Sequence, residues 1–270
     1  MINVIKANKR QEPFNEEKLM NSIRRAGIPR NIEENVLEHI KAKLYDGIST
    51  SEIYQHIIEF LASSEHPYSR TSYSLKDGIM QLGPTGYPFE DFIAALLRSF
   101  GYQTKVRQIL SGECITHEID VIASKDGKSS MIEAKFHNSP GVRSQIHVGL
   151  YTQARFEDVK ERNHLDEAWL VTNTKTTTDV NTYALCKKIK VISWSYPEGE
   201  SLRDMIEKSR LHPITILTSL SQSQKRTLLD NHIVLCKDIF LNNSLVDVLF
   251  LPPQDKQKLL SEVSYIAKQE

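Results

Sequence analysis

The stretch that decides the fold is HEIDVIASKDGKSSMIEAKFH, residues 117–137. It holds two apolar runs joined by an Asp-Gly pair, which is typical of a tight turn between antiparallel strands. The first run carries Asp120, and the second carries Glu133 and Lys135 with one residue between them. Side chains two apart in a strand lie on the same face, so Glu133 and Lys135 are expected to point the same way. The hairpin therefore predicts that these three polar side chains meet at one place.

These residue types predict a divalent-metal site. The carboxylates of Asp120 and Glu133 supply the oxygen ligands that Mg²⁺ or Mn²⁺ prefers, and the backbone carbonyl of Ala134 offers a further ligand. The ammonium of Lys135 would orient or deprotonate an attacking water, or stabilise charge on a phosphate under attack. Such a set serves the hydrolysis of phosphodiesters. The alternative is a solvated ion pair on a surface strand, but the apolar neighbours favour nearly buried strands, where unpaired charges are costly.

The pattern of Asp120 followed by Glu133-Ala134-Lys135 resembles the core of PD-(D/E)xK nucleases. Five segments resemble the Mrr-like branch of that superfamily: FEDFIAALLRSFGY (89–102), EIDVIA (118–123), MIEAKFH (131–137), LVTNTKTTTDVNTYA (170–184) and VISWSYPEGESLRDMI (191–206). The resemblance implies an α/β fold with a mixed central sheet flanked by helices. It also implies an acidic residue on the first helix, where Glu90 stands, that joins the site. A glutamine on the helix after the second catalytic strand is implied too; Gln145 and Gln153 are both candidates, and Gln153 is favoured.

Helices and strands are expected to alternate after residue 88. Apolar residues from Phe89 to Phe100 recur at helical spacing, with Glu90 on the border of the apolar stripe and Asp91 pointing away from it. The other expected elements are a strand around 103–108, the two strands of the hairpin, a helix over 142–162, a strand over 167–173, a helix over 179–188, a strand over 190–195 and a helix over 202–208.

Residues 1–84 predict a separate small domain that begins with a hairpin over residues 2–14. Asn15 is expected to cap a first helix closed by Gly27. The following helices are expected to begin at Asn31, at a cap formed by Thr50 or Ser51, and at about Ser69, with the last ending near Leu82. The Gly- and Pro-rich string over 83–88 predicts a linker to the next domain.

This first domain resembles the ATP cone, a regulatory nucleotide-binding module, over VIKANKRQEPFNEEKL (4–19), YDGISTSEIY (45–54) and YSLKDGIMQLGPTGY (73–87). The resemblance implies that ATP or dATP binds between the hairpin and the helices as an allosteric ligand. The implied contact residues are Val4, Lys6, Glu12, Phe14, Asn15, Lys18 and Thr50, and the basic Lys9 and Arg10 add charge for a triphosphate. The basic pair is displaced by three positions from its place in the family, and Tyr54 stands where some members have a histidine.

Composition indicates a chain of ordinary globular character with 270 residues and zero formal net charge. It fits three parts: the ATP cone over 1–84, the endonuclease domain over 88–210 and a helical C-terminal segment over 211–270. No apolar run approaches membrane-spanning length, and the N-terminal residues lack the layout of a signal peptide, so none is expected. Cys114, Cys186 and Cys236 lie far apart, which favours a reduced, cytoplasmic location over disulfides or a zinc site.

The sequence therefore predicts a metal-dependent endonuclease of restriction or defence type that cuts double-stranded DNA and is regulated by ATP or dATP. A homodimer or higher oligomer is expected, because cutting both strands needs two active sites. One alternative is a nucleotide-sensing regulator that binds nucleic acid without cutting it. Another is a nuclease for RNA or for structured DNA. Metal ligation by His117 or His137, which flank the site, is a further possibility, although such histidines more often mark strand ends.

Overall fold

The computed structural model describes residues 2–6, 9–25, 28, 30–62 and 75–268. Its chain forms two compact units. The central unit comprises Met80–Leu211 and the short segment Leu229–Val234. The outer unit comprises Met1–Ile79, His212–Leu228 and Leu235–Glu270. The expected end of the first helix at Gly27 and the expected helix start near Ser69 fall outside the described residues.

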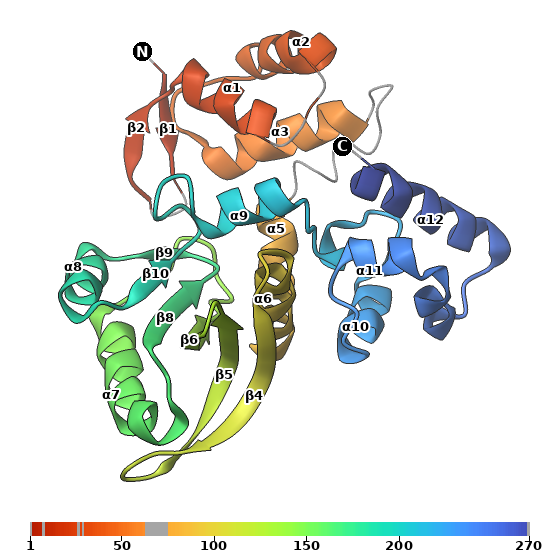
Figure 1. Ribbon diagram of the computed structural model, residues 1–270. Coiled ribbons are helices and arrows are strands. Elements are labelled where there is room, and N and C mark those ends of the chain that lie inside the picture. The colour runs from red at the N-terminus through yellow and green to blue at the C-terminus, as the bar shows by residue number, and fades with distance from the viewer. Residues whose placement is uncertain (1, 7–8, 26–27, 29, 63–74, 269–270) are drawn as a thin grey trace. The chain divides into compact units, whose positions relative to one another are not determined.

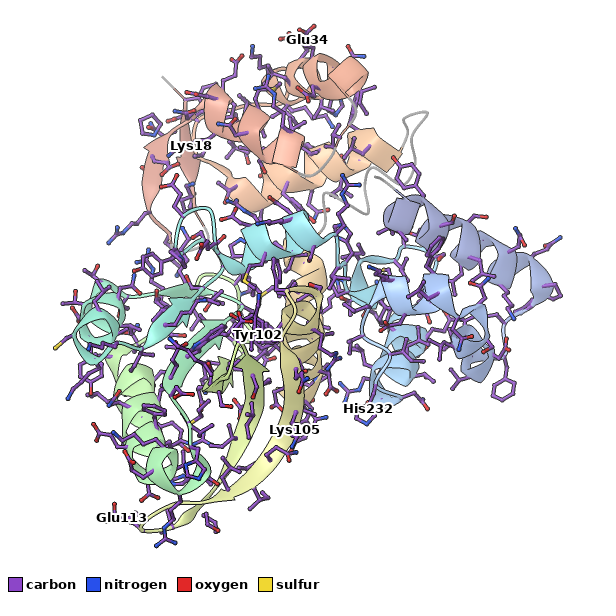
Figure 2. All side chains as sticks on the ribbon, in the orientation of Figure 1. Lys18, Glu34, Tyr102, Lys105, Glu113 and His232 are labelled. Atoms are coloured by element: carbon purple, nitrogen blue, oxygen red, sulfur yellow. The ribbon has the colours of Figure 1, made fainter. Side chains whose placement is uncertain are left out.

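The central unit is built on a five-stranded mixed sheet with the strand order β10-β8-β6-β5-β4 (Figure 1). Strands β4, β5 and β6 are antiparallel neighbours, whereas β6, β8 and β10 run parallel. The strands are β4 (Gln103–Ser111), β5 (Thr116–Lys125), β6 (Lys128–Lys135), β8 (Glu167–Thr172) and β10 (Lys190–Ile192). The expected mixed central sheet is confirmed. In Figure 2, Tyr102 marks the beginning of β4 and Glu113 marks the far end of the β4–β5 hairpin.

The turn between β5 and β6 is the one that the Asp-Gly pair predicts. Asp126 and Gly127 both have positive φ angles, 51° and 76°. Two successive residues with positive φ make a type I′ turn, whose twist matches that of the flanking strands. The turn joins Lys125 to Lys128, and it fixes the register that places Val121 opposite Ile132.

Helices cover both faces of this sheet. Helix α6 (Tyr87–Ser99) buries the predicted apolar stripe, and α9 (Leu202–Ser209) contacts α6. Helices α7 (Ile146–Asn163) and α8 (Thr178–Lys187) pack on the opposite face (Figure 1). There Val148 and Val180 belong to the same apolar cluster as Leu170. Helix α7 begins four residues later than expected, because β7 (Arg143–Ser144) pairs with β9 (Lys175–Thr176) just before it.

In the described residues before position 63, the N-terminal part of the outer unit has a three-stranded sheet in the order β2-β1-β3 and three helices around a common apolar core. The Asn15 side chain accepts a hydrogen bond from the Lys18 amide at 2.8 Å, so it is the N-cap that the sequence predicts. The cap expected at Thr50 or Ser51 is wrong by one residue: Ser49 accepts from the Glu52 amide at 3.0 Å. The elements are β1 (Asn3–Ile5), β2 (Gln11–Pro13), α1 (Glu16–Arg25), α2 (Arg30–Lys41), β3 (Ile48–Ser49), α3 (Thr50–Ala62) and α5 (Leu75–Met80).

The C-terminal part of the chain is helical, as expected. Its elements are η1 (Ile214–Ile216), α10 (Gln222–Asp230), α11 (Cys236–Leu241), η2 (Asn243–Leu249) and α12 (Pro253–Lys268). The buried carboxylate of Glu262 on α12 accepts hydrogen bonds from the amides of Thr218 and Ser219 at 2.7 and 2.9 Å, which fixes α12 to the chain after η1. Among the described residues, no helix is long and apolar enough to cross a bilayer.

Candidate active site

The site lies where strands β5 and β6 separate. Their ladder ends with the pair Val121–Ile132, so Asp120 and Glu133 are the first residues beyond it. The Oδ2 atom of Asp120 accepts a hydrogen bond from the Ala134 amide at 2.7 Å. The Asp120 carboxylate on β5 thus accepts a hydrogen bond from a backbone amide of β6. This bond fixes Asp120 beside the Glu133-Ala134-Lys135 segment.

Arg155 on α7 holds Glu133. One guanidinium nitrogen, Nη1, donates to Glu133 Oε2, and the other, Nη2, donates to the backbone carbonyl of Glu118. The guanidinium also lies 5.1 Å from the centre of the Tyr151 ring. Because the side chains of Arg155 and Glu133 are only 8% and 12% exposed, this is a buried ion pair, and loss of either partner would leave an uncompensated charge.

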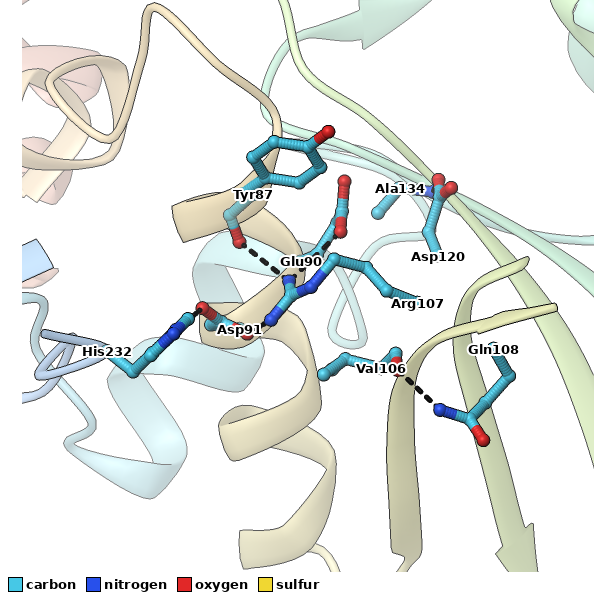
Figure 3. A network of polar contacts seen from close by, with 9 residues as sticks. All are labelled: Tyr87, Glu90, Asp91, Val106, Arg107, Gln108, Asp120, Ala134 and His232. Carbon is cyan, nitrogen blue, oxygen red and sulfur yellow. Dashed lines mark hydrogen bonds and ion pairs between the residues drawn. The ribbon is translucent and has the colours of Figure 1, made fainter. Parts of the chain in front are cut away.

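Arg107 on β4 holds Glu90 in the same way from the other face (Figure 3). Its Nη1 atom lies 3.1 Å from Glu90 Oε2, and its Nη2 atom lies 2.7 Å from Asp91 Oδ1. Asp91 is not among the buried residues of α6, in keeping with its expected place outside the apolar stripe, but its side chain is only 13% exposed because it is ion-paired with Arg107. Glu90 is buried, near the N-terminus of α6.

The carboxylates act on one another electrostatically. Burial, and then the negative charge of Asp120, raises the pKa of Glu90 to about 7. The same two causes, in the same order, raise the pKa of Glu133 to about 7. Burial also raises the pKa of Asp120, against the lowering effects of the Ala134 amide and of Arg155. The site therefore concentrates negative charge that a cation would stabilise.

Lys135 lies near this charge. It lowers the pKa of both Asp120 and Glu133 through its positive charge. Within the described part of the chain, its ammonium makes no hydrogen bond or ion pair, so it is available to a ligand.

The favoured glutamine, Gln153, makes its hydrogen bond within α7 and not to Asp120 or Glu133. Gln153 on α7 donates to Glu157 at 2.8 Å, and its Oε1 atom is buried without a partner among the described residues. Gln145 stands at the N-cap of α7 without a capping hydrogen bond from its side chain. The α7 residue that contacts the acidic residues is Arg155.

The two flanking histidines bind elsewhere. His117 lies 2.8 Å from Asp158 Oδ2, and His137 lies 2.9 Å from the Ser144 hydroxyl. Neither contact involves Asp120 or Glu133, so the alternative of histidine ligands gains no support from these contacts.

A pocket in the outer unit gathers the residues that the nucleotide resemblance implies. It has a volume of about 250 Å³ and lies between the N-terminal hairpin, α1 and α3. Lys18, labelled in Figure 2, is one of its lining residues. The lining comprises Val4, Lys6, Glu12, Phe14, Asn15, Lys18 and Thr50 from the predicted set, together with Leu19, Ser22, Ile53 and Tyr54. Lys9 and Arg10 are exposed and do not belong to this lining.

Charges inside this pocket are paired with one another. Glu12 Oε1 lies 2.9 Å from the Lys6 ammonium and 3.3 Å from the Lys18 ammonium. The bond from Lys6 is the largest cause of a lowered pKa of Glu12. The two ammonium groups are therefore held toward one point, where the carboxylate now stands.

Comparisons with known proteins divide the chain into three successive parts. Family models match the chain in order: an ATP cone domain over residues 2–75, a restriction endonuclease domain over 83–205 and an AF1548-like C-terminal domain over 212–267. An uncharacterized protein of Archaeoglobus fulgidus is 41% identical over 147 residues, which are 54% of this chain and 83% of that protein. The chain belongs to the AF1548-like family. The expected succession of an ATP cone and an Mrr-like endonuclease domain is confirmed.

Two solved structures were compared with the chain. The crystal structure of the protein of unknown function AF1548 has 34% sequence identity, covers 68% of this chain and 99% of its own, and has a TM-score of 0.60. A structure of Can2 from Sulfobacillus thermosulfidooxidans in complex with cyclic tetra-adenylate covers 73% of this chain and 56% of its own, at 12% identity and a TM-score of 0.32. The AF1548 likeness is thus the informative one for the fold.

The donor set of this AF1548-like chain fits a hard divalent cation. Asp120, Glu133 and Glu90 each engage one oxygen with a protein donor, which leaves the other oxygen for a ligand. In the described ranges, no three Asp, Glu, His or Cys side chains are grouped closely enough to hold a metal. Two carboxylates, with the Ala134 carbonyl and water completing the set, would suit a cation that keeps part of its water shell.

The two arginines were not predicted from the sequence. Arg107 and Arg155 lie 17 and 22 residues from their acidic partners Glu90 and Glu133. No local spacing rule connects residues so far apart. The one available signal is the pattern of α7, where Arg155 falls among its buried residues Thr152 and Val159.

Proposed function

We propose that this protein is a metal-dependent endonuclease that hydrolyses phosphodiesters in double-stranded DNA, in restriction or defence. The observation that supports it best is the meeting of Asp120, Glu133 and Lys135 at the opening of the β5–β6 ladder, in surroundings that raise the pKa of two acidic groups to about 7. A strongly perturbed acidic cluster inside an endonuclease-type domain is a good candidate for an active site.

Each residue has a role in this proposal. Asp120, Glu133 and the Ala134 carbonyl hold Mg²⁺ or Mn²⁺, and Glu90 adds a third negative group beside Asp120. When bound, the cation withdraws charge from the scissile phosphate. The Lys135 ammonium donates a hydrogen bond to the attacking water or to a phosphate oxygen that gains charge. Gln153 would have the supporting role of orienting the water through its Oε1, which is buried and has no hydrogen-bond partner among the described residues.

We further propose that ATP or dATP binds in the pocket of the ATP cone and regulates cleavage. Phosphate oxygens would replace the Glu12 carboxylate between the ammonium groups of Lys6 and Lys18. The chain has no Walker A motif, so the nucleotide would be a ligand and not a fuel. A nucleotide regulates only if it binds one functional state more tightly than the other.

The proposal includes the setting in which the protein acts. A homodimer or higher oligomer would supply the two active sites that a double-strand cut needs. The three cysteines are free, which is in keeping with a reducing compartment such as the cytoplasm.

The test is cleavage of a supercoiled plasmid with Mg²⁺ or Mn²⁺, with parallel arms on a branched DNA junction and on RNA, each with and without ATP or dATP. Asp120→Asn, Glu133→Gln and Lys135→Met are expected to abolish cleavage while the fold is retained. Lys187→Met, at an exposed position of α8, serves as the matched control. Wild-type rates in the three site variants would refute the proposal.

The alternative function is that of a regulator that senses nucleotide and binds nucleic acid without cutting it. The specific observation in its favour is the ion pair with Arg155, which engages the carboxylate of Glu133. In that case, the plasmid would be bound and shifted in a gel at every metal concentration, and it would remain uncut.

A further inference from the structure

Arg107 interrupts the pairing of β4 with β5. Its φ angle is 51°, in the left-handed region that residues other than glycine rarely adopt. Strand β4 pairs Val106 with Val121 and Gln108 with Ile119, but the intervening pair of Arg107 with Asp120 is missing. The side-chain amide of Gln108 donates, through Nε2, to the Val106 carbonyl at 2.7 Å, across the interruption (Figure 3). Strained backbone held in this way is typical of functional sites.

The conformation directs the guanidinium onto the first turns of α6. Arg107 reaches both Glu90 and Asp91, with nitrogen–oxygen distances of 3.1 and 2.7 Å. It also lies 3.5 Å from the Tyr87 carbonyl and 5.6 Å from the centre of the Tyr87 ring. One side chain thus fixes two neighbouring acidic residues, one of which lies beside Asp120.

A residue from the C-terminal part of the chain completes the network. His232, in the segment Leu229–Val234 of the central unit, lies 3.0 Å from Asp91 Oδ2. Asp91 therefore accepts from Arg107 on one oxygen and contacts His232 with the other (Figure 3). The segment after α10 is in this way connected to the acidic site through Asp91 and Arg107.

We propose that Arg107 is a positioning residue of the active site: it holds Glu90 beside Asp120 in the geometry that binds the cation, and Asp91 with His232 holds Arg107. This assignment rests on the proposed nuclease function. Repulsion between Glu90 and Asp120 favours rotation of Glu90 away from the site, and the ion pair with Arg107 opposes it. The planar guanidinium engages two carboxylates at once, which a single ammonium cannot reproduce.

The first test measures Mn²⁺ binding by calorimetry on the full-length protein, so its readout does not depend on cleavage. Arg107→Gln is expected to weaken Mn²⁺ binding by about 10- to 100-fold, and Arg107→Lys by less. Arg98→Gln is the matched control, since Arg98 joins α6 to β4 through Thr104 at 2.8 Å and contacts no acidic residue of the site. In plasmid cleavage, kcat of Arg107→Gln is expected to fall by about the same factor while KM stays at the wild-type value.

A second test needs no metal. Thermal unfolding of Arg107→Gln, Glu90→Gln and the double variant in EDTA forms a cycle, and the two Tm shifts are expected to be non-additive because the side chains are in contact. Additive shifts, or a Mn²⁺ affinity of Arg107→Gln equal to the wild-type value, would overturn the assignment of Arg107. If Asp120→Asn binds Mn²⁺ as tightly as the wild type, the proposed nuclease site itself fails, which is a distinct outcome.

Discussion

Replacing Glu90 by glutamine is expected to stabilise the metal-free protein at pH 8. The pKa of Glu90 is raised from 4.5 to about 7 in the folded state, chiefly by burial and then by Asp120. The folded state therefore binds this proton more tightly than the unfolded chain does. Below pH 4.5 the Glu90 carboxyl is protonated in both the folded and the unfolded state, so its ionisation does not affect the free energy of unfolding. As the pH rises to about 7, the unfolded chain gives up the proton first, and folding stability is lost.

The size of this effect follows from the pKa difference. At about 1.4 kcal/mol for each pKa unit, the rise from 4.5 to about 7 corresponds to a loss of about 3 kcal/mol above pH 7. Solvent screening reduces it little, because the Glu90 side chain is only 10% exposed. Glutamine has the same shape and still accepts a hydrogen bond from Arg107, but it carries no charge. Glu90→Gln should thus regain up to about 3 kcal/mol at pH 8, or about 6 to 12 °C in Tm.

The assay is thermal unfolding of wild type and Glu90→Gln in EDTA at pH 5 and pH 8. The variant should unfold at a higher temperature at pH 8 and at nearly the same temperature at pH 5. Glu161→Gln is the matched control and should change neither value, because this acid on α7 is 87% exposed. A Glu90→Gln protein that is no more stable than the wild type at pH 8, or is shifted equally at both pH values, would refute the reasoning.

Three further predictions concern the other charges. Arg155→Met leaves the Glu133 carboxylate buried without its cation and should cost about 3 to 5 kcal/mol in urea unfolding at pH 8; adding Glu133→Gln should recover most of it, and a single variant as stable as the wild type would contradict the ion pair. Mn²⁺ should raise Tm at pH 8, where the acidic groups are ionised, more than at pH 5, and Asp120→Asn should abolish the rise; a rise that persists in this variant places the ion elsewhere. Lys18→Gln should weaken ATP binding by about tenfold in calorimetry, because a charged hydrogen bond to phosphate is lost, whereas Lys9→Gln, outside the pocket lining, should not; equal losses would argue for a diffuse charge effect.

Local patterns were sufficient for much of this molecule. The Asp-Gly turn and the alternation around it place Asp120 opposite Glu133, because a type I′ turn fixes strand register within a few residues. Helical spacing over α6 identifies its buried face, and Asn15 identifies the start of α1. The same kind of local reasoning failed by one residue at Ser49, where two neighbouring hydroxyl residues compete for the cap.

Only the tertiary structure determined which arginine side chains pair with the buried acidic residues. Arg107 and Arg155 come from separate elements, β4 and α7, and they reach Glu90 and Glu133 only because those elements pack against the opening of the β5–β6 ladder. The late start of α7 has the same kind of cause, the β7–β9 pairing of distant residues. Side-chain periodicity and turn chemistry act over a few residues along the chain, whereas the partner of a buried charge depends on which distant segments share its desolvated surroundings.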